Sequence, residues 1–115
     1  MLKKAKRLTK DEEFDYVFKK GRSNYDKIIG IKAALNNLTC NRYGIMVSNK
    51  ISKKAVERNK IKRQIKVILN ILEENIKIGY DIIIIALPEI KEKKYSEIEI
   101  SIKNNLKKLK LDINV

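Results

Sequence analysis

The sequence contains no histidine and no tryptophan, and it has a single cysteine, Cys40, and a single proline, Pro88. Without histidine, a Ser–His or Cys–His nucleophile pair and a histidine-ligated metal are excluded. One cysteine allows no internal disulfide and no cysteine-rich zinc site. Cys40 therefore fits a reducing compartment and is expected to be a small, buried or half-buried apolar side chain. If the chain takes part in chemistry, it is not expected to supply the catalytic side chains.

Long apolar segments and nucleotide-binding loops are also missing. The longest apolar run, Ile82–Leu87, is far too short to span a bilayer, and the basic stretch Met1–Leu8 is not followed by the apolar region of a secretory signal. No Walker A loop and no GxGxxG motif occurs. We therefore expect one cytoplasmic domain over residues 1–115, with its core over about 7–111.

Positive charge is abundant, since 27 Lys and Arg stand against 14 Asp and Glu and give a net charge of +13. Such an excess favours a polyanionic partner, which can be a nucleic acid or an acidic membrane surface. Lys outnumbers Arg 22 to 5, a bias that an AT-rich genome also produces, so composition alone leaves solubility or coding bias open. The hydrophobic content of 43% is enough to fill a core.

Hydrophobic periodicity predicts three helices and at least three strands. The helices are expected over about 9–20, over 53–76 and from Ser96 onward. The strands are expected over 28–35, 43–48 and 80–87, with a further short strand between residues 21 and 43. The strand over 80–87 is expected to be buried on both faces. The order αβββαβα predicts an α+β fold, a small two-layer α/β sandwich.

Local signals predict where the helices begin and end. Thr9 with Glu12, and Ser96 with Glu99, fit capping boxes, and Ser52 is a candidate cap for the middle helix. Gly21 suits the left-handed position that follows a helix.

Basic residues concentrate in one segment around the start of the middle helix. Glu57 is the only acidic residue between residues 50 and 66, where eight cations lie: Lys50, Lys53, Lys54, Arg58, Lys60, Lys62, Arg63 and Lys66. On a helix, Arg58, Lys62 and Lys66 form one row, with Asn59 and Arg63 on the neighbouring row. Like charges at this spacing cost about 0.2–0.5 kcal/mol per pair, so a helix that accepts this cost favours a phosphate-binding role over a merely solvated face.

Two aromatic residues lie at helical spacing on the first helix. Phe14 and Phe18 fit a core stripe, and they also fit a semi-exposed platform on which unpaired bases stack. Spacing alone leaves both interpretations open.

The segment Ala55–Ile65 closely resembles the Arg-Asn-Arg signature helix of the bacterial ribonuclease P protein subunit. The remaining elements resemble that family in the same order: Arg7-Leu8 and Glu13–Gly21, Tyr43–Lys50, and Tyr80–Ile83. Lys60 stands where the family usually has a second Arg, which keeps the charge and loses the planar fork. The first central strand lacks an aromatic that some members carry, with Ile31 or Lys32 near that place.

The resemblance implies the family fold, a ribosomal protein S5 domain 2-like sandwich with a left-handed βαβ crossover. It implies a ribonuclease P holoenzyme, an endonuclease that removes the 5′ leader from precursor tRNA, in which a catalytic RNA and its bound Mg²⁺ perform the hydrolysis. The implied partners are this RNA and precursor tRNA, with no membrane and no obligate protein partner. Raised substrate affinity and a lower Mg²⁺ requirement are the implied effects of the protein.

The resemblance also implies the roles of individual residues. The signature helix would face the catalytic RNA, with contacts from Arg58, Asn59, Lys60, Lys62, Arg63 and Lys66. Lys50, Lys53 and Lys54 would extend this surface, and Phe14 and Phe18 would line a cleft that holds the single-stranded leader. A non-catalytic RNA-binding or ribosome-associated protein is the alternative.

Overall fold

A computed structural model describes residues 7–112 of the chain. The six N-terminal residues of the expected basic end and residues 113–115 lie outside the described part. The elements follow the expected order: α1 (Asp11–Lys20), β1 (Arg22–Tyr25), β2 (Ile29–Leu35), β3 (Arg42–Met46), α2 (Ala55–Leu72), β4 (Tyr80–Ala86) and α3 (Tyr95–Lys108). Two short 3-10 turns, η2 (Glu73–Asn75) and η3 (Pro88–Glu92), follow α2 and β4. The α+β class is confirmed, and β1 is the expected additional strand.

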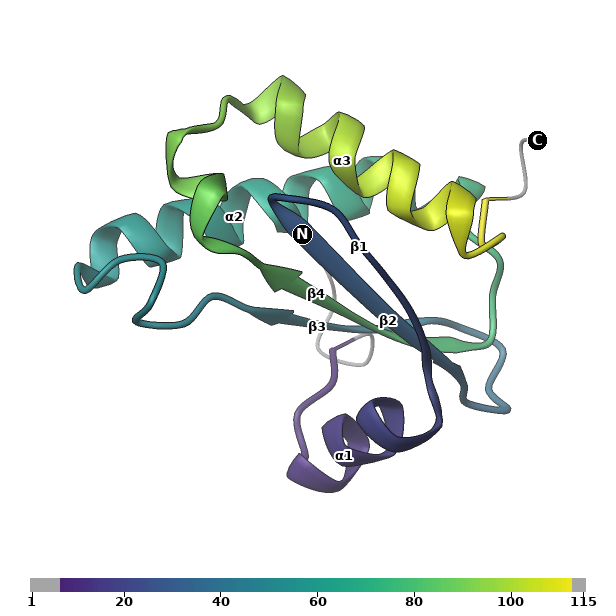
Figure 1. The fold of residues 1–115 in the computed structure, drawn as a ribbon. Helices are drawn as coiled ribbons and strands as arrows, with labels where there is room; N and C mark the ends of the chain where they lie inside the picture. The colour runs from purple at the N-terminus through teal and green to yellow at the C-terminus, as the bar shows by residue number, and fades with distance from the viewer. Residues whose placement is uncertain (1–6, 113–115) are drawn as a thin grey trace.

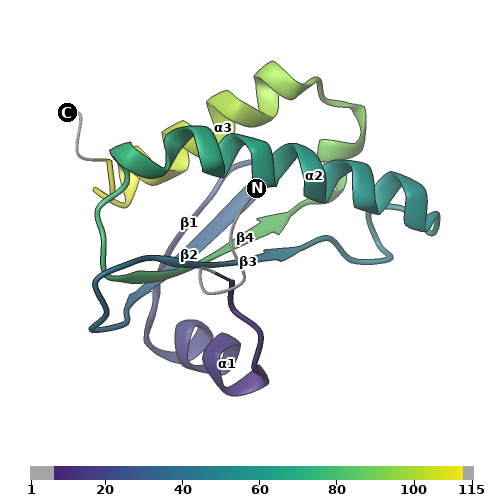
Figure 2. The same cartoon turned by 180° about the vertical axis from the view of Figure 1, so that it is seen from behind.

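The four strands form one sheet in the order β1-β2-β4-β3. β2 pairs antiparallel with β1 and with β4, whereas β3 pairs parallel with β4. The β3–α2–β4 segment is therefore a βαβ crossover, and its left-handed sense stays an expectation from the family. α2 and α3 cover one face of the sheet, and α1 lies against the other (Figures 1 and 2).

Alternation along the strands divides the buried side chains between these two faces. Ile31 on β2 and Ile84 on β4 belong to the main core, together with Ile65 of α2 and Ile102 of α3. A smaller core on the opposite face joins four residues: Leu8, Val17, Ala34 and Ile83. β4 is thus buried on both faces, as its continuous apolar run predicts.

The predicted capping boxes of α1 and α3 are wrong by one residue or more. Lys10 is the N-cap of α1, and Oε1 of Glu13 accepts hydrogen bonds from the backbone N–H of Thr9 at 2.9 Å and of Lys10 at 3.0 Å. In α3, Glu97 accepts from the backbone N–H of Lys94, the N-cap, at 3.2 Å. In both helices a carboxylate at the third helical position satisfies the exposed donors, without the Ser or Thr side chain that the pattern suggests.

The ends of the other elements also differ from expectation. Gly21 has an extended backbone (φ −77°, ψ 154°) because the chain passes directly from α1 into β1. The middle helix is shorter than predicted, since α2 ends at Leu72 and η2 continues the chain. Lys54 is the N-cap of α2, although the Ser52 hydroxyl accepts a hydrogen bond from its backbone N–H at 3.1 Å. Across residues 7–112, no helix is long and apolar enough to cross a membrane.

Candidate nucleic-acid interface

The first half of α2 has one side in the core and one cationic side. Ile61, Ile65 and Ile68 are buried against the sheet and α3. On the other side, Asn59, Lys60 and Arg63 are exposed, and three further cations are half-buried: Arg58, Lys62 and Lys66. A half-buried Lys or Arg lays its aliphatic stem along the protein and keeps its charged end in water. The helix therefore presents a fixed row of positive charge.

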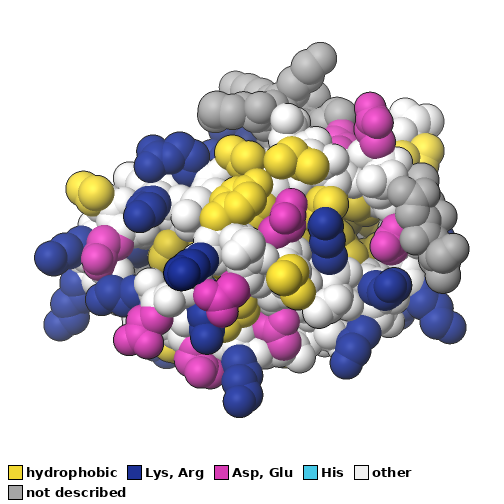
Figure 3. All heavy atoms as spheres, turned by 90° about the horizontal axis from the view of Figure 1, so that it is seen from above, with side chains coloured by type: hydrophobic (Ala, Val, Ile, Leu, Met, Phe, Trp, Pro, Cys, Tyr) yellow, Lys and Arg dark blue, Asp and Glu magenta, His cyan; other side chains and the backbone are white. Residues whose placement is uncertain are grey.

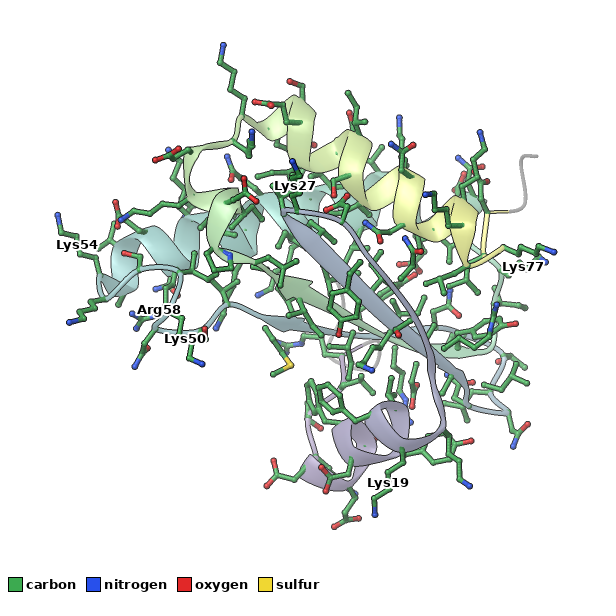
Figure 4. The ribbon with its side chains drawn as sticks, viewed as in Figure 1. Lys19, Lys27, Lys50, Lys54, Arg58 and Lys77 are labelled. Carbon is green, nitrogen blue, oxygen red and sulfur yellow. The ribbon has the colours of Figure 1, made fainter. Side chains whose placement is uncertain are left out.

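The loop before α2 adds to this charge and is held against the helix. Lys50, Lys53 and Lys54 are exposed, and Figure 4 shows Lys50, Lys54 and Arg58 together at the end of the molecule where α2 begins. Nη1 of Arg58 donates a hydrogen bond to the backbone oxygen of Ser52 at 2.9 Å. This contact fixes the position of the loop relative to the helix.

None of the eight cations forms an ion pair with an acidic side chain of the described residues. Glu57, the one acid in the segment, accepts a hydrogen bond from the Ser52 hydroxyl and lies 3.7 Å from Nζ of Lys91. The Ser52 hydrogen bond is the main reason why the pKa of Glu57 is lowered. From above, over α2 and α3, Lys and Arg side chains gather at this end with acidic side chains among them, and both signs occur over the rest of the face (Figure 3). An unpaired cationic cluster at a helix N-terminus is suited to binding phosphates.

A pocket of about 160 Å³ joins α1, β3 and α2 at the edge of the sheet. Phe14 lies over Gly44 in this pocket, so closely that a Cβ at residue 44 would come within 2.6 Å of its ring. Lys62 and Lys66 of α2 line the same pocket, which therefore combines an aromatic ring with two cations of the α2 row.

Phe18 lies apart from this pocket, although it shares a helix with Phe14. Its side chain is 41% exposed, and Nζ of Lys32 lies 5.6 Å from the centre of its ring, within cation–π range. Val17 between them is fully buried. Val17 thus occupies the core position of α1, whereas Phe14 is half-buried and Phe18 is on the surface.

The residues that hold α1 against the sheet were missed by the sequence analysis. Arg42 on β3 donates from Nε and Nη2 to the two carboxylate oxygens of Asp81 on β4, at 2.9 and 2.7 Å, and from Nη1 to Glu13 of α1 at 2.5 Å. Asp81 chiefly, and Glu13 in addition, raise the pKa of Arg42. The pKa of Glu13 is lowered, mainly by the backbone N–H groups of Lys10 and Thr9. Because Phe14 follows Glu13, this network positions the aromatic side of the pocket. A lone acid in an otherwise apolar strand, Asp81, is the signal that could have indicated a buried partner.

Comparison with known proteins identifies the class. The ribonuclease P family model matches residues 2–110. A ribonuclease P protein component of Alkaliphilus metalliredigens is 39% identical over 105 residues, which cover 91% of this chain and 94% of the relative. The Staphylococcus aureus RNase P protein structure has a TM-score of 0.87 at 34% identity, and covers 95% of this chain and 99% of that one. The Thermotoga maritima RNase P protein, in complex with a fluorophenyl thiourea, has a TM-score of 0.82 at 30% identity, covering 88% and 97%.

The two solved structures share the fold of this chain, and all three proteins match most of its length. The chain belongs to the ribonuclease P protein family. Its place is therefore in tRNA processing, as the protein component of a ribonucleoprotein with an RNA partner.

Proposed function

We propose that this chain binds the catalytic RNA of ribonuclease P through the cationic side of α2, and that it holds the 5′ leader of precursor tRNA beside α1. The observation that carries the proposal is the set of eight cations on the start of α2 and the loop before it, none of them paired with an acid in the described residues. Neutralising phosphates with these cations releases counterions from the RNA, which supplies affinity. Arg58 and Arg63 can each bind a phosphate through two parallel hydrogen bonds, whereas the lysines act as point charges.

The leader site is proposed from the pocket next to this helix. Phe14 offers a half-buried ring on which a base can stack, and Lys62 and Lys66, which line the same pocket, would pair with the backbone phosphates of that nucleotide. Phe18 offers a second, exposed ring on the same helix. A protein that holds both the RNA subunit and the leader raises the affinity for precursor over mature tRNA.

Hydrolysis is assigned to the RNA and its Mg²⁺. Residues 7–112 contain no group of three or more acidic or cysteine side chains placed to hold a metal ion. The surface proposed to face the RNA is moreover strongly cationic, which disfavours a divalent cation on the protein side. We propose that the Mg²⁺ is bound mainly by the RNA subunit. Its cations would lower the Mg²⁺ requirement by replacing part of the ionic screening between the RNA and its substrate.

The test is to reconstitute ribonuclease P from this chain and a bacterial catalytic RNA, and to measure cleavage of precursor tRNA at low Mg²⁺. We expect the chain to stimulate leader removal and to bind precursor more tightly than mature tRNA. Absence of stimulation would refute the proposal. Equal affinity for precursor and mature tRNA would instead favour a general RNA-binding or ribosome-associated protein.

A charge-matched pair of variants tests the location of the RNA contact. Arg58→Ala/Arg63→Ala is expected to reduce the slope of log affinity against log salt by about 1.4 to 1.8, the share of two phosphate contacts. Lys107→Ala/Lys108→Ala removes the same charge from exposed positions on α3 and is expected to leave the slope unchanged. Equal effects of the two pairs would mean that net charge, and not α2, determines binding.

A further inference from the structure

A row of side chains crosses the face of the sheet on which α1 lies. Tyr25 of β1 pairs with Gly30 of β2, Gly30 pairs with Ile85 of β4, and Ile85 pairs with Met46 of β3. Partners on neighbouring strands point to the same face of a sheet. Ile29, next to Gly30, belongs to the main core beneath α2 and α3, so the row points the opposite way.

This row lies just beyond the aromatic residues of α1. Phe18 is in contact with Lys32, and Phe14 lies over Gly44, so α1 covers the row that contains residues 32 and 44. Gly30 is two residues farther along β2 from Lys32, which is about 7 Å in a strand. The row stays open to solvent at both ends, because Tyr25 is 47% exposed and Met46 is 40% exposed.

Tyr25 packs directly on Gly30, which has no side chain to push the ring away. A Cβ at residue 30 would lie 2.2 Å from both Cδ2 and Cε2 of Tyr25, so the ring occupies the space that any other side chain would fill. One side of the ring thus packs on the backbone of β2, and about half of the residue faces water. Such a ring has lost most of its rotational freedom before a ligand arrives, which lowers the entropic cost of stacking.

The charges around the row suit a polyanion. Lys32 lies on the neighbouring row, and Lys50 lies beyond the end of β3 (Figure 4). Lys27, at the turn between β1 and β2, lies beside α3 on the other face. Asp26, the acid next to Tyr25 in sequence, is directed to the other face, where Ser101 and Asn105 of α3 donate hydrogen bonds to it. An exposed aromatic ring among cations is the usual arrangement of a single-strand binding surface.

We infer that Tyr25, supported by Gly30, stacks on a base of the single-stranded leader beyond the nucleotides held at Phe14 and Phe18. The inference rests on the proposed function and extends it, since it makes Tyr25 a determinant of how much of the leader the protein contacts. The other role open to Tyr25 is only to shield the backbone of β2.

The experiment compares holoenzymes reconstituted with wild-type protein, Tyr25→Leu and Tyr25→Phe, on precursor tRNAs with short and long leaders. Tyr25→Leu keeps an apolar cover over Gly30 and removes the aromatic ring. We expect it to weaken binding of the long-leader precursor about 5- to 150-fold, the loss of one stacked base, with short-leader binding unchanged. Tyr25→Phe keeps the ring and is expected to bind both substrates as the wild type does. Gly30→Ala, which displaces the ring, is expected to reproduce the Tyr25→Leu defect.

Thermal unfolding of each variant and a fluorescent base analogue placed along the leader complete the test. Quenching of the analogue by wild type and Tyr25→Phe, but not by Tyr25→Leu, would support stacking. Unchanged long-leader binding by Tyr25→Leu, or an equal loss on both leaders together with a lower unfolding temperature, would overturn the inference and leave the proposed function intact. A wild-type holoenzyme with no preference for precursor would refute both.

Discussion

Replacement of Arg42 by Met tests how α1 is held against the sheet. The carboxylate of Asp81 receives three side-chain hydrogen bonds, two from Arg42 and one from Asn36 at 2.9 Å. Asp81 is only 1% exposed, so water cannot replace the two that Arg42→Met removes without opening the structure. The variant also breaks the contact between Arg42 and Glu13, which is the link from β3 to α1.

The expected loss is large for a domain of this size. Removing one partner of a buried ion pair costs about 3–5 kcal/mol, because the remaining charge stays buried without compensation. Arg42 is itself partly exposed, with 24% of its side chain accessible, so we expect a value near the lower end, about 3 kcal/mol. With a urea m-value of about 1–3 kcal/mol/M, the unfolding midpoint is expected to fall by about 1–3 M.

Urea unfolding followed by circular dichroism measures this loss, at one fixed salt concentration because the net charge of +13 makes stability depend on screening. The control is Arg42→Met/Asp81→Asn, which removes the buried charge as well. It is expected to be more stable than Arg42→Met by at least about 1 kcal/mol, since a neutral amide is less costly to bury than an unpaired carboxylate. A loss below about 1 kcal/mol in Arg42→Met, or no recovery in the double variant, would refute the reasoning.

Three further predictions follow from the described contacts. Gly44→Ala places a Cβ 2.6 Å from the Phe14 ring and is expected to destabilise the protein by about 1–3 kcal/mol and to weaken leader binding; a variant with wild-type melting and leader affinity would contradict the pocket geometry. Phe18→Ala is expected to keep the wild-type unfolding temperature, because the ring lies on the surface and Phe18 belongs to neither buried core, and to reduce leader binding; the reverse pattern would show that Phe18 is a packing residue. Burial alone would raise the pKa of Asp26, but hydrogen bonds, from the Ser101 hydroxyl first, outweigh it and lower the pKa. Its stabilising contribution is therefore complete above about pH 4 and is lost as the pH falls through the lower folded-state pKa. Asp26→Asn is expected to flatten the acid side of the profile of urea midpoint against pH, and an unchanged profile would exclude this role.

The order of helices and strands could be predicted because it depends on neighbouring residues. A helix repeats its contacts every three or four residues and a strand every two, so the apolar pattern of α2 and the β-branched run of β4 each indicate one element. The exact ends of the helices could not be predicted in this way. Three consecutive acids precede Phe14, and the local pattern does not show which of their carboxylates caps α1. The structure selects Glu13, the acid that also reaches Arg42.

The eight-cation segment, too, is a property of the sequence, since its members lie within 17 consecutive positions (50–66). Helical spacing separates the five from Arg58 to Lys66 from the apolar stripe that begins at Ile61. The family resemblance rests on the same segment. Which of these cations contact RNA stays a prediction.

Only the tertiary structure brings together residues that are far apart in the chain. Residues 13, 42 and 81 meet in one network, and Tyr25, Gly30, Ile85 and Met46 form one row, because strand order and register are decided by long-range pairing across the sheet. Sequence periodicity predicts which side chains of a strand share a face, but it does not predict which strands are neighbours in the sheet. Helix spacing likewise groups Phe14 with Phe18, and only the packing of α1 on the sheet separates a half-buried ring in a pocket from an exposed one beside Lys32.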